Sequence, residues 1–273
     1  MITLITDSTA CMTRAEAELF GVRLVPMHYT IGGTSYLESF SDCNGNFEAL
    51  LAQNSGTTAQ ASVSDFTKVF QEIVGRGDEA LCLVISSRLS GAYSSASIAA
   101  LSVAPQRIAV VDSRTTAGGL TLLLKQAAKL ARCGVSLKSI ADSVKQMRKR
   151  TGTAFSVSSM DSLRRSGRLS VVRQSVNTIL NIRPILLLDK DEGALVSGGT
   201  ARGRSAQMQA LADQVPENAS EVLIQSLGST AAPALLEKVR AKLPHASITC
   251  GTLGPVLGVN IGLDAIGVSW ISE

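Results

Sequence analysis

Short apolar runs alternate with helically spaced ones through the first half of the chain. Continuous apolar stretches predict strands at residues 2–5, 22–26, 81–85 and 108–111. Amphipathic spacing predicts helices at 14–20, 64–74, 94–101, 116–132 and 137–150, and Ser64 is a candidate N-cap. Repeated strand–helix units with continuously apolar strands are typical of a parallel sheet that has helices on both faces.

The pattern changes after residue 150. Strands are predicted at 154–157, 185–188, 195–198, 222–225, 247–250 and 265–270, and helices at 160–165, 176–181 and 231–242. The polar residues 189–193 separate two of these strands and predict a hairpin, which places antiparallel pairs in the second sheet. We therefore expect an α/β protein with a three-layer α/β/α domain at residues 1–150 and a smaller two-layer α+β domain with a mixed sheet at residues 151–273.

Composition and charge exclude several classes of protein. Hydrophobic residues make up 45% of the chain and charged residues 18%, which is typical of a globular protein. The net charge of +4 comes without a basic stripe that carries aromatic residues, so no nucleic-acid partner is expected. The five cysteines form no C-x-x-C pair, which argues against a zinc site or a disulfide framework.

The chain shows neither a signal-peptide pattern nor an apolar run of about 18 residues. A cytoplasmic protein without a transmembrane segment is therefore expected. The basic run at residues 145–150 is interpreted as a solvated helix end, where cations interact favourably with the helix dipole. A transient contact of this run with a membrane or a partner stays open.

Hydroxyl side chains gather where three of the predicted parallel strands end. They lie in residues 6–9, 86–95 and 112–116, and the carboxyl edge of an open parallel sheet is where ligands bind. Serine and threonine are also ordinary N-caps, so each turn alone has a structural interpretation. Their occurrence on one edge favours a binding site.

Motifs for common chemistries are missing from this edge. The chain contains no P-loop, no G-x-G-x-x-G after the first strand and no G-x-S-x-G nucleophile elbow. Its two histidines, His28 and His245, fall in predicted loops, where a Ser-His-Asp triad is hard to assemble. Hydroxyl donors without a general base suit the binding of a carboxylate better than catalysis.

Several segments, in order along the whole chain, resemble motifs of the DegV family. They are residues 5–9 (ITDST), 58–66 (TAQASVSDF), 85–96 (ISSRLSGAYSSA), 111–113 (VDS), 163–169 (LRRSGRL), 181–186 (NIRPIL) and 254–258 (GPVLG). The resemblance implies a bacterial, cytoplasmic fatty-acid-binding protein of two α/β domains with the acyl chain in a tunnel between them. Some members are the lipid-carrying subunit of fatty acid kinase, whose separate ATP-dependent subunit phosphorylates the presented carboxylate to acyl phosphate for phospholipid synthesis.

The resemblance also assigns residues. Thr58 and Ser90 match the two hydroxyls that bind the fatty-acid carboxylate in the family. Further candidate contacts of the head group or the cleft are Gly91, Asn260, Arg168, Arg202 and Ser8. A long-chain acid such as palmitate is then the ligand, and neither a catalytic residue, a metal nor another cofactor is expected.

Two departures from the family pattern fall in the head-group segment and at the position linked to the kinase partner. The family's T-S-Q-P-S reads T-A-Q-A-S here, and its G-T-H reads Gly258-Val259-Asn260. Asparagine cannot become cationic near neutral pH, so the case for a kinase partner is weaker than the case for a fatty acid.

Candidates for the tunnel wall, with plain core as the alternative for each, are Leu163, Leu169, Ile179, Leu180 and Ile185.

Two other functions stay open on the sequence. A small-molecule hydrolase or phosphotransferase would use Asp7 and Asp112 to hold Mg²⁺ with a phosphorylated substrate. A scaffold with a vestigial pocket is the other, and the absent histidine keeps it open.

Overall fold

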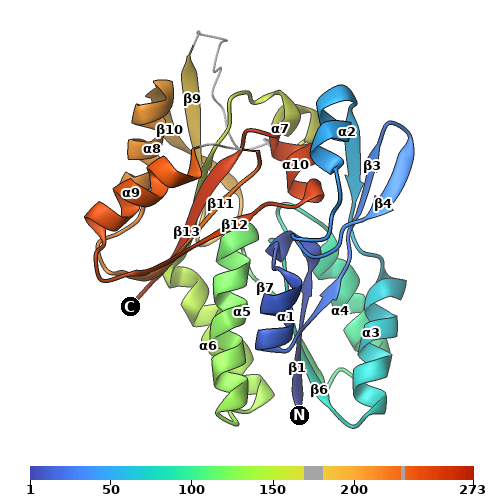
Figure 1. Ribbon diagram of the computed structural model, residues 1–273. Helices are drawn as coiled ribbons and strands as arrows, with labels where there is room; N and C mark the ends of the chain where they lie inside the picture. Colours follow the sequence, from blue (N-terminus) through green and yellow to red (C-terminus); the bar gives the residue numbers. More distant parts are fainter. Residues whose placement is uncertain (169–180, 229–230) are drawn as a thin grey trace.

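A parallel sheet, sheet A, forms the centre of the first half of the molecule. The computed structural model describes residues 1–168, 181–228 and 231–273 (Figure 1). Sheet A has the order β2-β1-β6-β7, and every neighbouring pair in it is parallel. Its strands are β1 (Ile2–Asp7), β2 (Val22–Val25), β6 (Glu79–Val84) and β7 (Ile108–Asp112). The four predicted strands and their parallel arrangement are confirmed.

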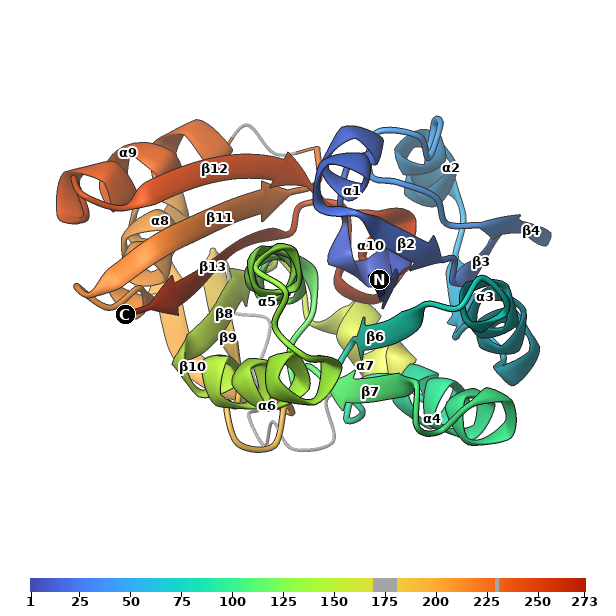
Figure 2. The same ribbon diagram turned by 90° about the horizontal axis from the view of Figure 1, so that it is seen from below.

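Helices cover both faces of sheet A because its strands are apolar on both sides. Leu4, Leu81 and Leu83 pack in one buried cluster, whereas Ile5 and Cys82, which point the other way, pack in a second. The first cluster includes residues of α1 (Arg14–Phe20), α5 (Ala117–Arg132) and α6 (Leu137–Met147), and the second includes residues of α3 (Val63–Gly75) and α4 (Ala92–Val103). Figure 2 shows the strands between these two groups of helices.

The predicted N-cap of α3 (Val63–Gly75), Ser64, is wrong. Helix α3 is capped by Ser62, whose side chain accepts a hydrogen bond from the Asp65 backbone N–H, while the Asp65 carboxylate accepts from the Ser62 N–H. This reciprocal capping box places the start of the helix before Ser64.

A small antiparallel sheet, which the sequence analysis did not predict, follows β2. It has the order β4-β3-β5 and consists of β3 (His28–Ile31), β4 (Thr34–Leu37) and β5 (Gly56–Ala59), with α2 (Phe47–Gln53) before its last strand. Tyr29 and Tyr36 stack across β3 and β4 with 5.1 Å between ring centroids. Each strand has only four residues and β4 is largely exposed, so the alternation of β3 is too short to indicate a strand.

The second half of the chain forms a six-stranded mixed sheet, sheet C, with the order β10-β9-β8-β13-β11-β12. Its only parallel pair among the described residues is β11 with β12, and β9 and β10 form the predicted hairpin. The strands are β8 (Thr151–Ser156), β9 (Ile182–Leu188), β10 (Leu195–Arg202), β11 (Ala219–Ser226), β12 (Ser247–Thr252) and β13 (Ile266–Ser272). The mixed α/β fold class is therefore confirmed.

The helices of the second half are α7 (Asp161–Ser166), α8 (Gly203–Gln214), α9 (Ala232–Lys242) and α10 (Pro255–Ile261). Neither α8 nor α10 was predicted, and the helix expected at 176–181 falls on residues of which all but the last lie outside the described ones. The basic run does follow a helix: α6 ends at Met147, and the 3-10 turn η2 (Arg148–Arg150) follows it.

Helix α5 lies between the two sheets. It contacts β1 and β6 of sheet A and β8, β11 and β13 of sheet C (Figures 1 and 2). Sheet C begins at Thr151, next to the expected domain boundary at residue 150, and that boundary stays a prediction. Within the described ranges, every helix is too short or too polar to cross a lipid bilayer.

Candidate functional site

A largely apolar cavity, called here the inner cavity, lies between the two sheets. Its volume is about 390 Å³, within the range of small-molecule pockets. Apolar side chains from both halves of the molecule line it, among them Ile85, Leu89, Phe155, Leu188, Leu223 and Leu257. Of the tunnel candidates, Leu163 lines the cavity, while Ile185 belongs to the core of sheet C. Leu169, Ile179 and Leu180 lie outside the described residues.

A second, polar cavity of about 800 Å³, called here the outer cavity, adjoins the first. Hydroxyl and amide side chains line it together with Arg165 and Asp264. Both cavities share four lining residues, Thr58, Arg168, Asn260 and Ile261. Three of the four are polar, so the passage between the cavities is the place where an amphipathic ligand would have its polar end.

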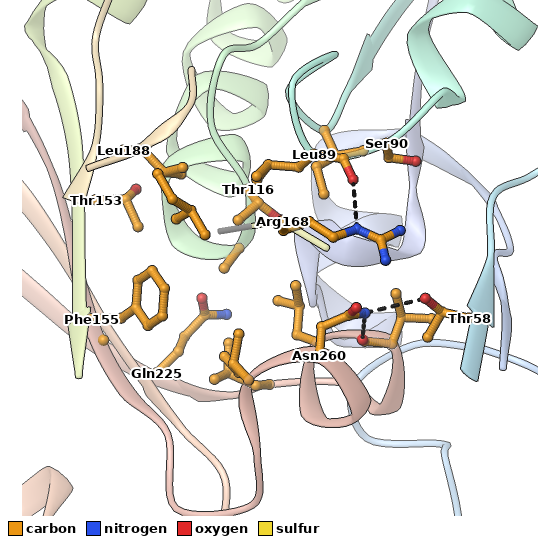
Figure 3. Close-up of a pocket in the computed structure, with 18 of the residues that line it drawn as sticks. Thr58, Leu89, Ser90, Thr116, Thr153, Phe155, Arg168, Leu188, Gln225 and Asn260 are labelled. Carbon is orange, nitrogen blue, oxygen red and sulfur yellow. Dashed lines mark hydrogen bonds between the residues drawn. The ribbon is translucent and has the colours of Figure 1, made fainter. Parts of the chain in front are cut away.

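Asn260 orients the Thr58 hydroxyl at this junction. The Asn260 Nδ2 group donates to Thr58 Oγ1 at 3.2 Å and to the Val256 carbonyl oxygen at 2.7 Å (Figure 3). Both amide hydrogens are therefore engaged, and Thr58 Oγ1 acts as an acceptor. Its own hydrogen has no acceptor within the described part of the chain, so the hydroxyl is free to donate to an anion in the junction.

Ser90 reaches the same inner cavity from the turn between β6 and α4. Its Oγ accepts a hydrogen bond of 3.3 Å from the Ala92 backbone N–H, as a residue near a helix start commonly does. Gly91 touches the site indirectly: a Cβ there would lie 2.2 Å from Oε1 of Gln60, so the glycine admits Gln60 to the cavity wall. The sequence analysis did not identify Gln60 as a site residue.

Arg168 is the only charged side chain among the described residues of the inner cavity. Its Nε donates to the Leu89 carbonyl oxygen at 3.2 Å, and its Nη1 donates to the Ser166 carbonyl oxygen at 2.7 Å (Figure 3). Arg168 forms no ion pair with a carboxylate of residues 1–168, 181–228 or 231–273. Its positive charge is thus oriented at the junction and available to an external anion.

Besides Gly91, two of the residues named from the sequence line neither cavity. Arg202 is exposed at the end of β10, where it pairs with Ile182. Ser8 is buried, and its hydroxyl donates to the Glu38 carboxylate while it accepts from the Met27 backbone N–H. The hydrogen-bonding capacity of Ser8 is therefore used inside the protein.

Glu38, which no sequence signal indicated, anchors the helix that carries Asn260. Its Oε1 accepts a 2.9 Å hydrogen bond from the Val256 backbone N–H in the first turn of α10. Burial raises the pKa of the Glu38 carboxyl to about 7, although the hydrogen bonds from Ser8 and Val256 oppose the rise. Nearby Asp7 adds a smaller upward contribution to the same pKa. A buried carboxyl group therefore supports one wall of the cavity.

The structure does not bring Asp7 and Asp112 together. Their strands, β1 and β7, lie on either side of β6 in sheet A, so their backbones are about 10 Å apart. The Asp7 carboxylate accepts from the Ile85 and Thr9 backbone N–H groups, and that of Asp112 accepts from Ser87 and Arg114. Burial raises the pKa of Asp7. Across the ranges that the structure describes, no group of three or more His, Cys, Asp or Glu side chains is arranged to hold a metal ion.

The fold and the cavities define an α/β protein with a parallel sheet, a mixed sheet and a small antiparallel sheet, and with an apolar pocket between the first two. The family model described as "Uncharacterised protein, DegV family" matches residues 1–273, and the chain therefore belongs to the DegV family. The family resemblance of the sequence motifs is confirmed.

Known relatives match over nearly the full length. A DegV domain-containing protein of Halalkalibacterium halodurans is 29% identical over 281 residues, covering 100% of this chain and 99% of the relative. A solved structure from Thermus thermophilus, described as "Fatty Acid Binding of a DegV family Protein", is 29% identical, has a TM-score of 0.87 and covers 100% of this chain and 99% of that one. A DegV lipid binding protein of Thermotoga maritima has a TM-score of 0.90 and 24% identity, covers 99% of this chain and 98% of that one, and shows the likeness of the fold.

Proposed function

We propose that this protein binds a long-chain fatty acid, with the acyl chain in the inner cavity and the carboxylate at the junction with the outer cavity. The observation that carries the proposal is the junction itself. A free hydroxyl hydrogen on Thr58 and the guanidinium of Arg168, which has no carboxylate partner among the described residues, lie where a largely apolar cavity meets a polar one. The fatty-acid binding described for the Thermus thermophilus relative supports the same ligand class.

The energetics fit such a ligand. Burying a 16-carbon chain contributes on the order of 10 kcal/mol before the ordering costs of binding. The polar junction then mainly orients the acid. Thr58 and Ser90 supply neutral hydroxyl donors, and Arg168 supplies the compensating charge.

We further propose that the protein carries the acid rather than transforms it. Neither histidine lines a cavity, and His28 instead lies 3.9 Å from the Asp65 carboxylate. The Asp7 and Asp112 carboxylates are engaged in backbone hydrogen bonds, which disfavours the metal-dependent hydrolase or phosphotransferase. Hydroxyl donors and one cation bind a carboxylate reversibly and in a defined position, which is what a carrier requires.

As an extension, we propose that the protein presents the bound fatty acid to a separate ATP-dependent kinase subunit, which phosphorylates its carboxylate. The outer cavity supports this extension, because it gives the junction a polar approach lined by small hydroxyl residues and by Arg165. The extension requires acyl phosphate to form from palmitate and ATP in a mixture of this protein and such a subunit. Product formed at the same rate without this protein would contradict it.

The carboxylate site is tested by the double variant Thr58→Val and Ser90→Ala. Loss of two hydrogen bonds to the head group should weaken palmitate binding by about 2 kcal/mol, roughly 30-fold in Kd, in a titration by calorimetry. Thr34→Val, on the exposed strand β4, is the matched control and should leave the affinity unchanged. Unchanged affinity of the double variant would place the head group elsewhere.

Native mass spectrometry tests the ligand class directly. The purified protein should carry a mass corresponding to a fatty acid, or should take up added palmitate at a ratio of one to one. A protein that neither carries nor takes up any fatty acid would overturn the proposed function.

A further inference from the structure

The inner cavity has a second polar region, away from the junction. Thr116 at the start of α5 lines it together with three residues of sheet C, Thr153, Gln225 and Ser269. In Figure 3, Thr153 and Gln225 lie on one side of the cavity, and Thr58 and Ser90 lie on the other. A plain acyl chain anchored at Thr58 would bring its hydrocarbon tail against these polar groups.

Gln225 is the clearest anomaly in this region. Only 4% of its surface is exposed, and its side chain forms no hydrogen bond with any described residue. Its amide is directed into the cavity, as Figure 3 shows. A buried amide without a partner is unfavourable, which indicates that a ligand atom pairs with it when the cavity is filled.

Thr116 is a second unpartnered group in the same wall. Its Oγ1 is buried without a hydrogen-bond partner in the described structure, although Thr116 is the N-cap residue of the 16-residue helix α5. An N-cap hydroxyl normally accepts a bond from its own helix, and this one does not.

Close approach of sheet C to α5 gathers these groups. A Cβ on Gly118 would lie 2.9 Å from Ser269 Oγ and 3.2 Å from Gln225 Oε1, so the glycine lets both side chains reach the first turn of the helix. Thr153 Oγ1 lies 3.0 Å from Ser269 Oγ and 3.0 Å from Thr115 Oγ1. These hydroxyls have partners, whereas the Gln225 amide and the buried Thr116 hydroxyl have none among the described residues.

We infer that the preferred ligand is a fatty acid with a second, uncharged oxygen, a hydroxyl or keto group, in the distal part of its acyl chain. This inference rests on the proposed function and specifies its substrate class. Gln225 offers both a donor and an acceptor to the cavity, which match an alcohol, whereas the buried Thr116 oxygen reaches a ligand only by rotation of its side chain. A second carboxylate does not fit, because Arg168 at the other end is the only charged residue among the described lining.

The Gln225 amide makes the cavity select between plain and hydroxylated fatty acids. A plain chain leaves the Gln225 amide desolvated and without a partner, whereas a correctly placed hydroxyl satisfies it. We expect at least one distal isomer to bind at least 10-fold more tightly than palmitate. An isomer with its hydroxyl in the middle of the acyl chain, between the junction and the distal polar region, should bind more weakly than palmitate, because its hydroxyl would be buried among apolar side chains.

The test is a calorimetric titration of palmitate and of a positional series of monohydroxy-hexadecanoic acids. Gln225→Leu should lose the preference for the distal isomers and bind palmitate more tightly than the wild-type protein does. Thr116→Val removes a single hydroxyl and should reduce the preference partly. The wild-type series decides the question even if the Gln225 variant does not fold.

The outcomes separate this inference from the proposed function. Palmitate binding with no distal isomer preferred, or an equal change for all acids in both variants, would overturn the inference and leave the fatty-acid function intact. Failure of every acid to bind the wild-type protein would overturn both.

Discussion

Asn260 shows how one side chain sets the chemistry of its neighbour. Its amide donates to Val256 and to Thr58, so the Thr58 hydroxyl has its hydrogen left for a ligand. The resemblance of the sequence motifs leads us to expect a histidine at this position. An asparagine keeps the orienting role without adding a positive charge, and the charge at the junction then comes from Arg168 alone among the described lining of the inner cavity.

Glu38 makes stability depend on pH at the scale of one residue. Its pKa is about 7 in the folded protein against an ordinary value of 4.5, because burial disfavours the charged form. Between these two values the folded protein keeps the proton while the unfolded chain releases it. The contribution of Glu38 to stability therefore falls as pH rises from about 4.5 to 7 and is constant above that. Burial raises the pKa of Asp7 as well, with the same sign.

Glu38→Gln should remove this dependence, because glutamine accepts from Val256 and does not titrate. We expect urea unfolding to show the variant gaining stability relative to the wild-type protein between pH 5 and pH 8. Glu72→Gln is a suitable control, since Glu72 is exposed and its pKa is lowered by its hydrogen bond to Arg23. Parallel pH profiles of wild type and Glu38→Gln would contradict the role assigned to this carboxyl.

At the scale of elements, the register of sheet C depends on close contacts that no pattern in the sequence indicates. Gly152 on β8 lies opposite Trp270 on β13. A Cβ on Gly152 would lie 2.2 Å from Cζ2 of the buried indole. The ring has no room to move aside, so the pairing of two central strands depends on a residue without a side chain.

Gly152→Ala should therefore destabilise the protein by about 1–3 kcal/mol, the usual cost of overpacking a core. Gly75→Ala is the matched control: Gly75 ends α3, and a Cβ there meets no atom within 4 Å. That change should raise stability by about 0.5 kcal/mol through helix propensity. Equal effects of the two substitutions in urea unfolding would show that the Trp270 contact is not the cause.

The elements also show which sequence patterns are reliable. The strands of sheet A were predicted because both faces are buried and their apolar runs are continuous. Strands β3, β4 and β5 were not predicted, because four residues are too few for an alternation such as that of β3 to be distinct. Helix α10 was missed for a similar reason: it has seven residues, begins with Gly254-Pro255 and is held by Glu38 from a distant loop.

At the scale of the whole molecule, the site is assembled from distant parts of the chain. Thr58 and Asn260 are 202 positions apart and meet because α10 packs against β5. Helix α5 contacts both sheet A and sheet C. Its first turn lies beside Gln225 and Ser269 of sheet C, while its apolar residues fill the core of sheet A. A ligand between the sheets contacts both halves of the protein.

Local patterns in the sequence determined the parallel sheet, the hairpin, the mixed second sheet and the family motifs that name Thr58 and Ser90, because period and short motifs are properties of neighbouring residues. Only the tertiary structure decided which polar groups share a cavity. Packing places Arg168 and Asn260 beside Thr58 and directs Gln225 into the cavity, whereas Arg202 lies outside it. Packing also engages the Ser8 hydroxyl with Glu38 and separates Asp7 from Asp112 by one strand. These outcomes depend on long-range packing, which no local pattern encodes.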